Sequence, residues 1–526
     1  MAWSHERREW ELPRLREAHQ MPALDNISAD FWSVKFYPYT APGVDPVFAV
    51  VGGKRILVCR PPSGKDNASM ETIQVILDQE NDIEHFACAW SKDIETGTPL
   101  LCVAGASGQI KVLDVVTGKL LRTFAGHGAE INDLAVSPIN PYIVASASED
   151  CTIRIWSLDP RHTSQPCVAI LEGDSHVSAV LSLAFHPAGR YLLSAGQDHR
   201  INLWTLPDFS EAGTGMTLTR LYYPHFSTSE IHGDIVDCIA WYGDLILSKS
   251  DKEEVIVLWS ITNFNSALPT LPPSSAPTTH DTTRESRSAF VTPPASLADN
   301  AISLYTRLIQ FSIPESNIMF TRFSLFPGNK NSEFGRNPVI AFCNTNSKVF
   351  FFDLARLENY YDVAELIDDA TKTATPGGNS NSARSSSATS KKSEESQNLS
   401  IPTEQNPRAH PFLAPFQRRN RGGGGGSSLS RLARETSLTE STNSDQTNQD
   451  ETHAGKAAGK IDWAKSKEGW KKKYKLGDPL KSLEAHHEVM VRPLKFTGRQ
   501  VAWSNDGMWC VVVGSEGSIG VMGRWK

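Results

Sequence analysis

The sequence predicts an all-β fold, a seven-bladed β-propeller interrupted by two long disordered insertions. Three observations predict it. A unit of about 30 residues recurs along the chain, polar and tryptophan residues recur at fixed places within the unit, and seven copies can be counted from about residue 31 to residue 526. Seven blades close a ring and leave only short, protected strand edges.

Two copies of the unit are clear, GHGAEINDLAVSPINPYIVASASEDCTIRIW and SHVSAVLSLAFHPAGRYLLSAGQDHRINLW. Each contains three apolar runs separated by turn residues, the pattern of successive short strands. In both, an aspartate follows a serine after four residues and a tryptophan stands six residues further on. The recurring residues are His127, Ser146, Asp150 and Trp156 in the first copy, and His176, Ser194, Asp198 and Trp204 in the second.

This register resembles the WD40 repeat, although the terminal dipeptides here are Trp156-Ser157 and Trp204-Thr205. The resemblance implies that histidine, serine, aspartate and tryptophan form a buried hydrogen-bonded chain within each blade. A catalytic serine, histidine and aspartate set is the alternative interpretation. Because the set recurs in each repeat, we interpret it as structural and predict no catalytic residues.

Weaker copies complete the ring. One carries His232, Ser248 and Trp259 with one extra residue between serine and tryptophan. Since the last unit reaches residue 526, we expect ring closure to borrow a strand from the N-terminal end. The predicted division is a charged extension at 1–30, blades 1–4 and part of the ring closure at 31–263, a disordered insertion at 264–300, a blade at 301–370, a disordered insertion at 371–459, a basic segment at 460–480 and the last blade at 481–526.

Both insertions are poor in apolar residues, and the second includes five consecutive glycines at 422–426. Such segments bury too little apolar surface to offset the entropy of ordering. The second insertion ends in a basic stretch, KAAGKIDWAKSKEGWKKKYKL at 456–476, in which Trp463, Trp470 and Tyr474 alternate with lysines. Three interpretations remain open: a contact with DNA or RNA, a nuclear localisation signal, or a lysine-rich helix that docks its aromatic residues on the propeller.

Composition excludes several classes of protein. The chain is 40% hydrophobic and 21% charged, with a net charge of -7, which argues against a general nucleic-acid binder. Its eight cysteines are scattered singly, so we predict no metal site and buried, reduced thiols in an intracellular protein. No secretory signal, apolar membrane span, nucleophile motif or phosphate-binding glycine loop is found, which predicts no enzymatic activity, no cofactor and no membrane partner.

Two longer runs are more specific than the repeat. They are GASGQIKVLDVVTGKLLRTFAGHGAEIND and HFSTSEIHGDIVDCIAWYGDLILSKS, and both resemble the Embryonic ectoderm development/Extra sex combs family, the WD-repeat subunit of Polycomb repressive complex 2. The resemblance covers 31–360 and 480–526. It implies a nuclear, non-catalytic chromatin scaffold that maintains transcriptional repression. The alternative is a WD40 scaffold or substrate adaptor in another nuclear assembly, a corepressor or ubiquitin ligase, without methyl-lysine binding.

The resemblance also implies partners. One face of the family's propeller binds trimethyl-lysine on the histone H3 tail, of the lysine-27 type, in an aromatic cage. The opposite face holds an Enhancer-of-zeste-type methyltransferase subunit, alongside the other subunits of the complex, and binding of the mark stimulates that enzyme.

The family's cage positions fall at Trp32, Phe86, Met319 and Phe320. Aromatic faces attract a quaternary ammonium through their quadrupoles. Met319 departs from the family's tryptophan; its sulfur is polarisable but lacks a comparable quadrupole. The expected consequence is weaker affinity, or replacement by another aromatic such as Phe31. The alternative for each residue is packing between blades.

Three further residues are predicted to bind the peptide. Arg499, in GRQVAWSND, matches a family arginine near the peptide, and Asn132 and Asp237 stand where inner strands begin, near one rim of the ring. For Asn132 and Asp237, an equally open alternative is that they satisfy the turns at the strand starts.

Overall fold

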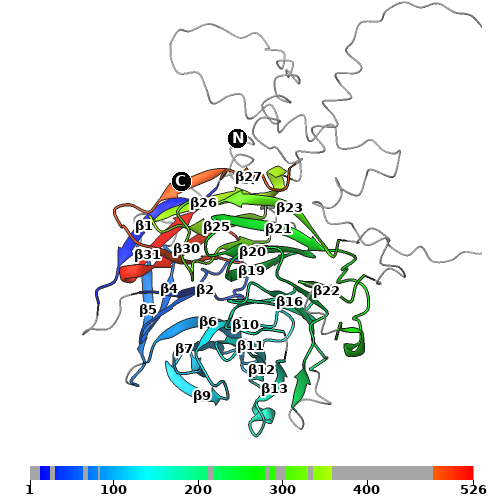
Figure 1. Ribbon diagram of the computed structural model, residues 1–526. Helices are drawn as coiled ribbons and strands as arrows, with labels where there is room; N and C mark the ends of the chain where they lie inside the picture. The colour runs from blue at the N-terminus through cyan, green and yellow to red at the C-terminus, as the bar shows by residue number, and fades with distance from the viewer. Residues whose placement is uncertain are drawn as a thin grey trace, which may run out of the picture. The chain divides into compact units, whose positions relative to one another are not determined.

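The computed structural model describes residues 12–23, 30–62, 69–80, 83–173, 175–209, 218–278, 285–291, 303–329, 336–357 and 478–524. Its strands form seven sheets, all within the compact unit made of 1–355 and 476–526. Each sheet packs against the next along the chain, and the last packs against the first, so the sheets close a seven-bladed ring (Figure 1). The predicted fold class is confirmed.

Four blades contain four strands each, ordered from the innermost outward. Blade 1 is β2 (Ser33–Phe36), β3 (Phe48–Gly52), β4 (Arg55–Arg60) and β5 (Glu71–Leu77). Blade 2 is β6 (His85–Lys92), β7 (Pro99–Gly105), β8 (Gln109–Asp114) and β9 (Lys119–Ala125). Blade 6 is β24 (Ser324–Phe326), β25 (Val339–Cys343), β26 (Lys348–Asp353) and β28 (His487–Met490). Blade 7 is β29 (Gly498–Trp503), β30 (Trp509–Gly514), β31 (Ser518–Gly523) and β1 (Arg14–Gln20).

The other three blades contain a fifth, outer strand. Blade 3 is β10 (Ile131–Val136), β11 (Ile143–Ser148), β12 (Ile153–Ser157), β13 (Cys167–Leu171) and β17 (Thr219–Leu221). Blade 4 is β14 (Val180–Phe185), β15 (Tyr191–Gly196), β16 (Ile201–Thr205), β18 (Phe226–Thr228) and β22 (Ser286–Ser288). Blade 5 is β19 (Val236–Tyr242), β20 (Leu245–Ser250), β21 (Val255–Ile261), β23 (Tyr305–Ser312) and β27 (Ser482–Leu483). Within the described ranges, three short 3₁₀ turns accompany the strands: η1 (Pro160–His162), η2 (Pro273–Ser275) and η4 (Ser515–Gly517).

The N-terminal strand closes the ring. β1 pairs antiparallel with β31, so that Arg14 lies opposite Gly523 and Gln20 opposite Ser518 (blue beside red in Figure 1). This confirms the predicted borrowing of an N-terminal strand. It also places part of the 1–30 extension inside blade 7.

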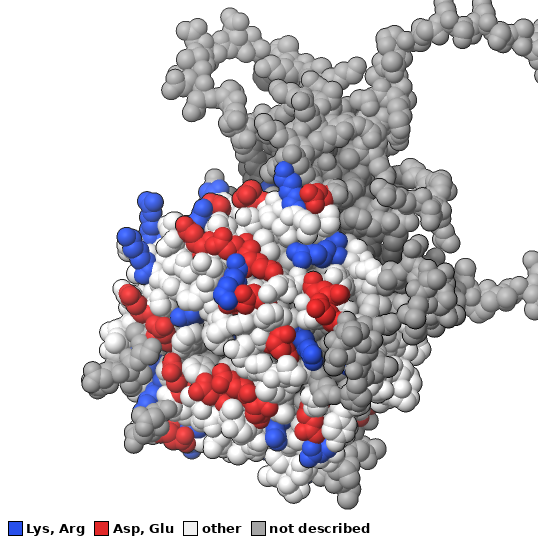
Figure 2. Space-filling model, viewed as in Figure 1, with Lys and Arg blue, Asp and Glu red and all other residues white. Residues whose placement is uncertain are grey.

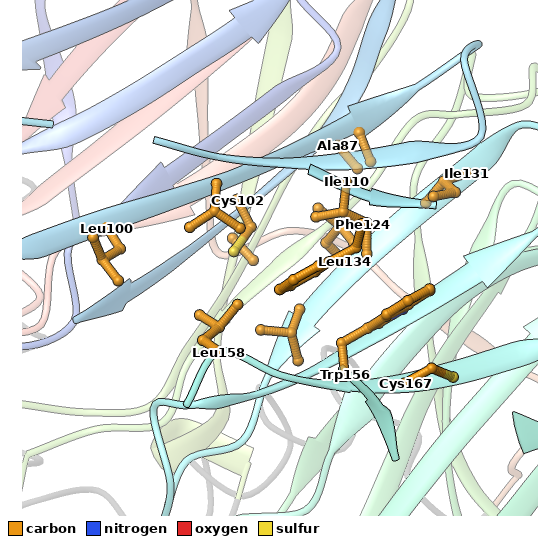
Figure 3. Close-up of a cluster of buried hydrophobic side chains, with 14 of the residues drawn as sticks. Ala87, Leu100, Cys102, Ile110, Phe124, Ile131, Leu134, Trp156, Leu158 and Cys167 are labelled. Atoms are coloured by element: carbon orange, nitrogen blue, oxygen red, sulfur yellow. The ribbon is translucent and has the colours of Figure 1, made fainter. Parts of the chain in front are cut away.

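Apolar side chains fill the spaces between neighbouring blades. Between blades 2 and 3, Phe124 on β9 stacks against Trp156 on β12 with ring planes 1° apart and centroids 5.6 Å apart (Figure 3). Trp156 is 1% exposed. Burial of so large an aromatic surface, added to the stacking, makes each such tryptophan a principal stabilising contact between blades.

Three further predictions about the division of the chain are wrong. Residues 31–263 contain the three inner strands of five blades, not of four. Strands β27 and β28 complete blades 5 and 6, so the segment that begins at 481 is not the last blade alone. Part of the 264–300 insertion is ordered, because β22 pairs with β18 and Phe290 packs against the core of blades 4 and 5. The predicted insertion at 371–459 and the basic segment up to 477 lie outside the described residues.

All eight cysteines are free thiols, and all but Cys151 are buried. Burial raises the pKa of the Cys59 thiol to about 12 and that of Cys88 to about 11, so neither is activated as a nucleophile. Among the described residues, no group of acidic, histidine and cysteine side chains has the arrangement of a metal site. No helix in the same ranges is long and apolar enough to cross a bilayer.

Candidate functional site

The predicted polar chains are present in blades 3 and 4. In blade 3 the Trp156 indole N–H donates to Ser146 Oγ (2.8 Å), Ser146 Oγ lies 2.7 Å from His127 Nε2, and His127 Nδ1 lies 2.8 Å from Asp150. Because a carboxylate only accepts, we assign the imidazole proton to Nδ1 and the serine hydroxyl proton to the bond with Nε2. The four residues His127, Ser146, Asp150 and Trp156 thus form one hydrogen-bonded chain in blade 3.

Blade 4 repeats the chain with the second set. Trp204 donates to Ser194 Oγ at 3.0 Å, Ser194 meets His176 Nε2 at 2.8 Å, and His176 Nδ1 lies 3.1 Å from Asp198. Burial acts to raise the pKa of both aspartates. The bonds from histidine and from backbone N–H groups outweigh it and hold the pKa of Asp150 and of Asp198 below the ordinary range.

Blade 5 uses a glutamate in place of the aspartate. His232 contacts Ser248 through Nε2 (2.7 Å) and Glu253 through Nδ1, and the Trp259 indole donates to Ser248 at 3.0 Å. Glu253 stands five residues after the serine, where the other two blades place aspartate after four. The longer side chain therefore compensates for the extra residue noticed in the sequence.

Five of the other predicted site residues, Trp32, Phe86, Asn132, Asp237 and Arg499, occupy one repeated place in the blades. In blades 2, 3, 4, 5 and 7 the innermost strand contains a β-bulge near its start, and the bulged residues are Phe86, Asn132, Leu181, Asp237 and Arg499. Trp32 directly precedes β2 in blade 1, where its backbone N–H donates to Val51. A bulge redirects one side chain out of the strand's alternation. We call these six positions the rim positions.

Three aromatic rings from three blades meet near this rim. Trp32 lies between the other two: its ring centroid is 5.9 Å from Phe86 and 6.2 Å from Phe320, both edge to face. All three side chains are partly exposed, whereas Phe31 is fully buried. We call Trp32, Phe86, Met319 and Phe320 the rim cluster. The sequence suggests that Phe31 could replace the family's tryptophan, which is methionine here at position 319. That suggestion is wrong, because Phe31 belongs to the core of blades 1 and 7.

Glycines opposite the rim positions allow the chain to approach. A Cβ atom at Gly52 would overlap the carbonyl oxygen of Asp30, and one at Gly105 would overlap that of Glu84. Those two carbonyls lie two residues before Trp32 and Phe86. The absence of a side chain on the second strand therefore sets where both aromatic residues emerge.

Arg499 joins the two sides of the rim cluster. Its guanidinium carbon lies 4.2 Å from the Trp32 ring centroid, Nη1 donates to the Met319 carbonyl at 3.3 Å, and Nη2 lies 3.9 Å from Asp30. Burial lowers the pKa of Arg499 against the opposing influence of Asp30. The Trp32 indole N–H donates to Glu84 at 3.1 Å, which fixes the orientation of the ring.

Asn132 and Asp237 are at rim positions but are buried. The Asn132 amide donates to the Val180 carbonyl at 3.2 Å. Asp237 forms an ion pair with Lys249 at 2.9 Å, and both side chains are 0% exposed. These contacts favour the structural alternative for both residues. Their role in binding a peptide stays a prediction.

Sequence reasoning missed Glu84, which bonds to Trp32 of the rim cluster, and Arg322, which follows the cluster in the chain and pairs with Asp133. Glu84 could have been found, because it precedes Phe86 by two residues. Arg322 follows Phe320 by two residues, but its partners come from distant blades. On the face seen in Figure 2, acidic residues form larger continuous patches than basic ones.

Comparisons with known proteins agree with this architecture. The WD domain, G-beta repeat model matches residues 118–157 and 165–205, which span the inner strands of blades 3 and 4. The Polycomb protein EED of Chaetomium thermophilum is 39% identical over 98% of this chain and 96% of its own length. The Polycomb protein esc of Drosophila melanogaster is 30% identical over 65% of this chain and 74% of its own.

Solved structures give the same relationship. A chain of the Chaetomium thermophilum Polycomb repressive complex 2 is 37% identical, with a TM-score of 0.75, and 98% of each chain is covered. A second structure of that complex contains histone H3 trimethylated at lysine 27; its matching chain is 38% identical, with a TM-score of 0.75 and 98% of each chain covered. Sequence, repeats and ring together show that this chain belongs to the family of the Polycomb proteins EED and esc.

Proposed function

We propose that this chain is the non-catalytic WD40 subunit of a nuclear Polycomb repressive complex 2-type histone methyltransferase, and that its rim cluster binds trimethyl-lysine of the histone H3 tail. The observation that carries the proposal is the meeting of Trp32, Phe86 and Phe320, partly exposed, from three different blades. Chains of Chaetomium thermophilum Polycomb repressive complex 2 match along 98% of this chain, one of them in a complex with trimethylated H3.

The chemistry of the cluster suits a quaternary ammonium. Such a cation cannot donate a hydrogen bond, so it is recognised by aromatic faces and by a negative potential nearby. Trp32 supplies the largest ring; Glu84 accepts its indole N–H, and Asp30 lies 3.9 Å from the Arg499 guanidinium that covers the ring. The bound mark then stimulates the methyltransferase subunit, which the opposite face of the ring holds.

A second candidate is a scaffold that assembles with its partners without binding the mark. One observation favours it: the Arg499 guanidinium already stacks 4.2 Å from the Trp32 centroid, and a cation in that place competes with a ligand. The prediction that 456–476 contacts DNA or RNA concerns residues outside the described ranges and stays a prediction.

Fluorescence polarisation with H3-tail peptides separates the two candidates. Peptides trimethylated at lysine 27 or at other lysines, and the unmodified peptide, are titrated with the wild-type chain, with Phe86→Ala and with Tyr222→Ala. Tyr222 is 48% exposed and lies outside the rim cluster, so it is the matched aromatic control. We expect selective binding to the lysine-27-trimethylated peptide that only Phe86→Ala abolishes. If the chain binds all peptides equally, or binds none of them, only the second candidate, a scaffold that does not bind the mark, remains.

A further inference from the structure

Arg322 lies two residues before β24, the inner strand of blade 6, and two residues after Phe320. Its backbone N–H donates to the Arg499 carbonyl at 2.7 Å, and it forms a parallel bridge with Gln500 of blade 7. The backbone that carries Met319 and Phe320 is therefore attached to blade 7 at this residue.

The side chain of Arg322 extends to blades 3 and 4. Its Nη2 donates to the carbonyls of Asn132 (2.9 Å) and Leu181 (2.8 Å), which are rim positions of those blades. Its Nη1 lies 2.8 Å from Asp133, and the two side chains are 10% and 7% exposed. Asp133 in turn accepts the backbone N–H of Leu183 at 2.9 Å. One guanidinium thus connects blade 6 with blades 3 and 4.

The segment that Arg322 anchors is strained. Phe320 has a φ of 59°, in the left-handed region that bulky residues rarely occupy. Such a conformation costs on the order of 1–3 kcal/mol and persists only where surrounding contacts impose it. Thr321, next in the chain, is fully buried and donates to the Ile318 carbonyl at 3.1 Å. Buried anchors therefore follow Phe320 immediately on its C-terminal side.

We propose that Arg322 is the positioning residue of the rim cluster: its buried fork, held by Asp133 and by two carbonyls, keeps Phe320 in the conformation that places its ring beside Trp32. The role of the cluster as a ligand site rests on the proposed function; the positioning itself does not. A lysine cannot replace the arginine at this position, because an ammonium lacks the planar fork that reaches a carboxylate and two carbonyls together.

The test compares Arg322→Lys with the matched control Arg307→Lys. Arg307 also donates to a backbone carbonyl, that of Ile231 at 2.8 Å, but it lies on β23, an outer strand of blade 5. Amide hydrogen exchange is measured on the free, full-length protein, and affinity for the lysine-27-trimethylated peptide is measured beside it. We expect Arg322→Lys to accelerate exchange about tenfold at 318–321 while the other blades keep their protection, and to weaken peptide binding about tenfold. Arg307→Lys changes neither quantity.

Other outcomes overturn the proposal. Unchanged exchange at 318–321, equal acceleration in all blades, or local acceleration with unaltered peptide affinity would each show that Arg322 does not position the cluster. If the wild-type chain binds no trimethylated peptide, the proposed function fails, and the exchange data alone decide the role of Arg322. Should Arg322→Lys not fold, Asp133→Asn removes the opposite charge from the same pair and is expected to give the same local exchange pattern.

Discussion

Blades 3, 4 and 5 differ from blades 1, 2, 6 and 7 in both hydrogen bonding and strand number. The first group contains five strands per blade and a tryptophan, serine and histidine chain ending in a carboxylate. The second group contains four strands per blade, and no such chain is found in its described residues. All four members of the rim cluster, and Arg499, come from the second group.

The comparison shows that the candidate site lies in the blades that lack the repeated hydrogen-bonded chain. In blades 3, 4 and 5, which contain the hydrogen-bonded chains, the residue at the rim position is either apolar, as is Leu181, or buried and bonded within the protein, as are Asn132 and Asp237. In blades 1 and 2 the equivalent positions are partly exposed aromatics. We infer that blades 3 to 5 supply rigidity and that the others supply the ligand contacts.

The largest expected effect on stability comes from replacing a buried tryptophan between blades by alanine, compared with the same replacement of the partly exposed Trp32 in the rim cluster. Trp204 is 1% exposed, and Trp204→Ala should lower the free energy of unfolding by about 3–5 kcal/mol through the lost transfer energy and the cavity. Trp32→Ala should cost about 1 kcal/mol yet abolish binding of the trimethylated peptide. Urea titration followed by circular dichroism measures the first quantity. Similar losses of stability in both variants would contradict the division between blades.

Acid should weaken blades 3, 4 and 5, whose hydrogen-bonded chains end in a carboxylate. The pKa values of Asp150, Asp198 and Glu253 are held below their ordinary range in the folded chain. Their stabilisation is therefore complete above the unfolded pKa, near 3.9 for aspartate and 4.3 for glutamate, and is lost as pH falls through the lower folded values. We expect Asp150→Asn to lower the melting temperature at pH 7, and the difference from wild type to shrink progressively as pH falls below about 5, past the unfolded pKa towards the lower folded one. A difference that does not depend on pH would show that the carboxylate charge contributes nothing.

The smallest expected effect concerns blade 5, whose hydrogen-bonded chain ends in a glutamate instead of an aspartate. Shortening its carboxylate with Glu253→Asp should break the bond to His232, because the extra residue moves the backbone away from the histidine. The expected loss is about 1 kcal/mol, the usual net value of one hydrogen bond. Thermal unfolding of this variant and of the reciprocal variant Asp150→Glu measures the loss. If Glu253→Asp leaves the stability unchanged, the longer glutamate side chain is not what compensates for the extra residue between Ser248 and the carboxylate.

The ring and the hydrogen-bonded chains of blades 3 and 4 could be predicted from the sequence because both depend on residues close together in the chain. Trp156, Ser146 and His127 lie within one repeat, so their spacing is visible. The bond from Arg322 to Asn132 joins residues 190 positions apart, and no local pattern indicates it. The order in part of 264–300 was missed for a related reason: a few residues such as Phe290 pack onto blades formed elsewhere in the chain, and composition averages them away.

The most direct test of the central claim asks whether the rim cluster recognises positive charge. Isothermal titration compares the H3 peptide trimethylated at lysine 27 with a peptide bearing its uncharged isostere, in which carbon replaces the quaternary nitrogen. Shape and apolar area are the same, so the difference comes from the charge: its attraction to the aromatic faces, worth about 0.5–2 kcal/mol, and to the nearby carboxylates. We predict binding of the charged peptide that is roughly tenfold tighter, with the preference lost in Phe86→Ala. Equal affinity for the two peptides would contradict an aromatic cage at Trp32, Phe86 and Phe320.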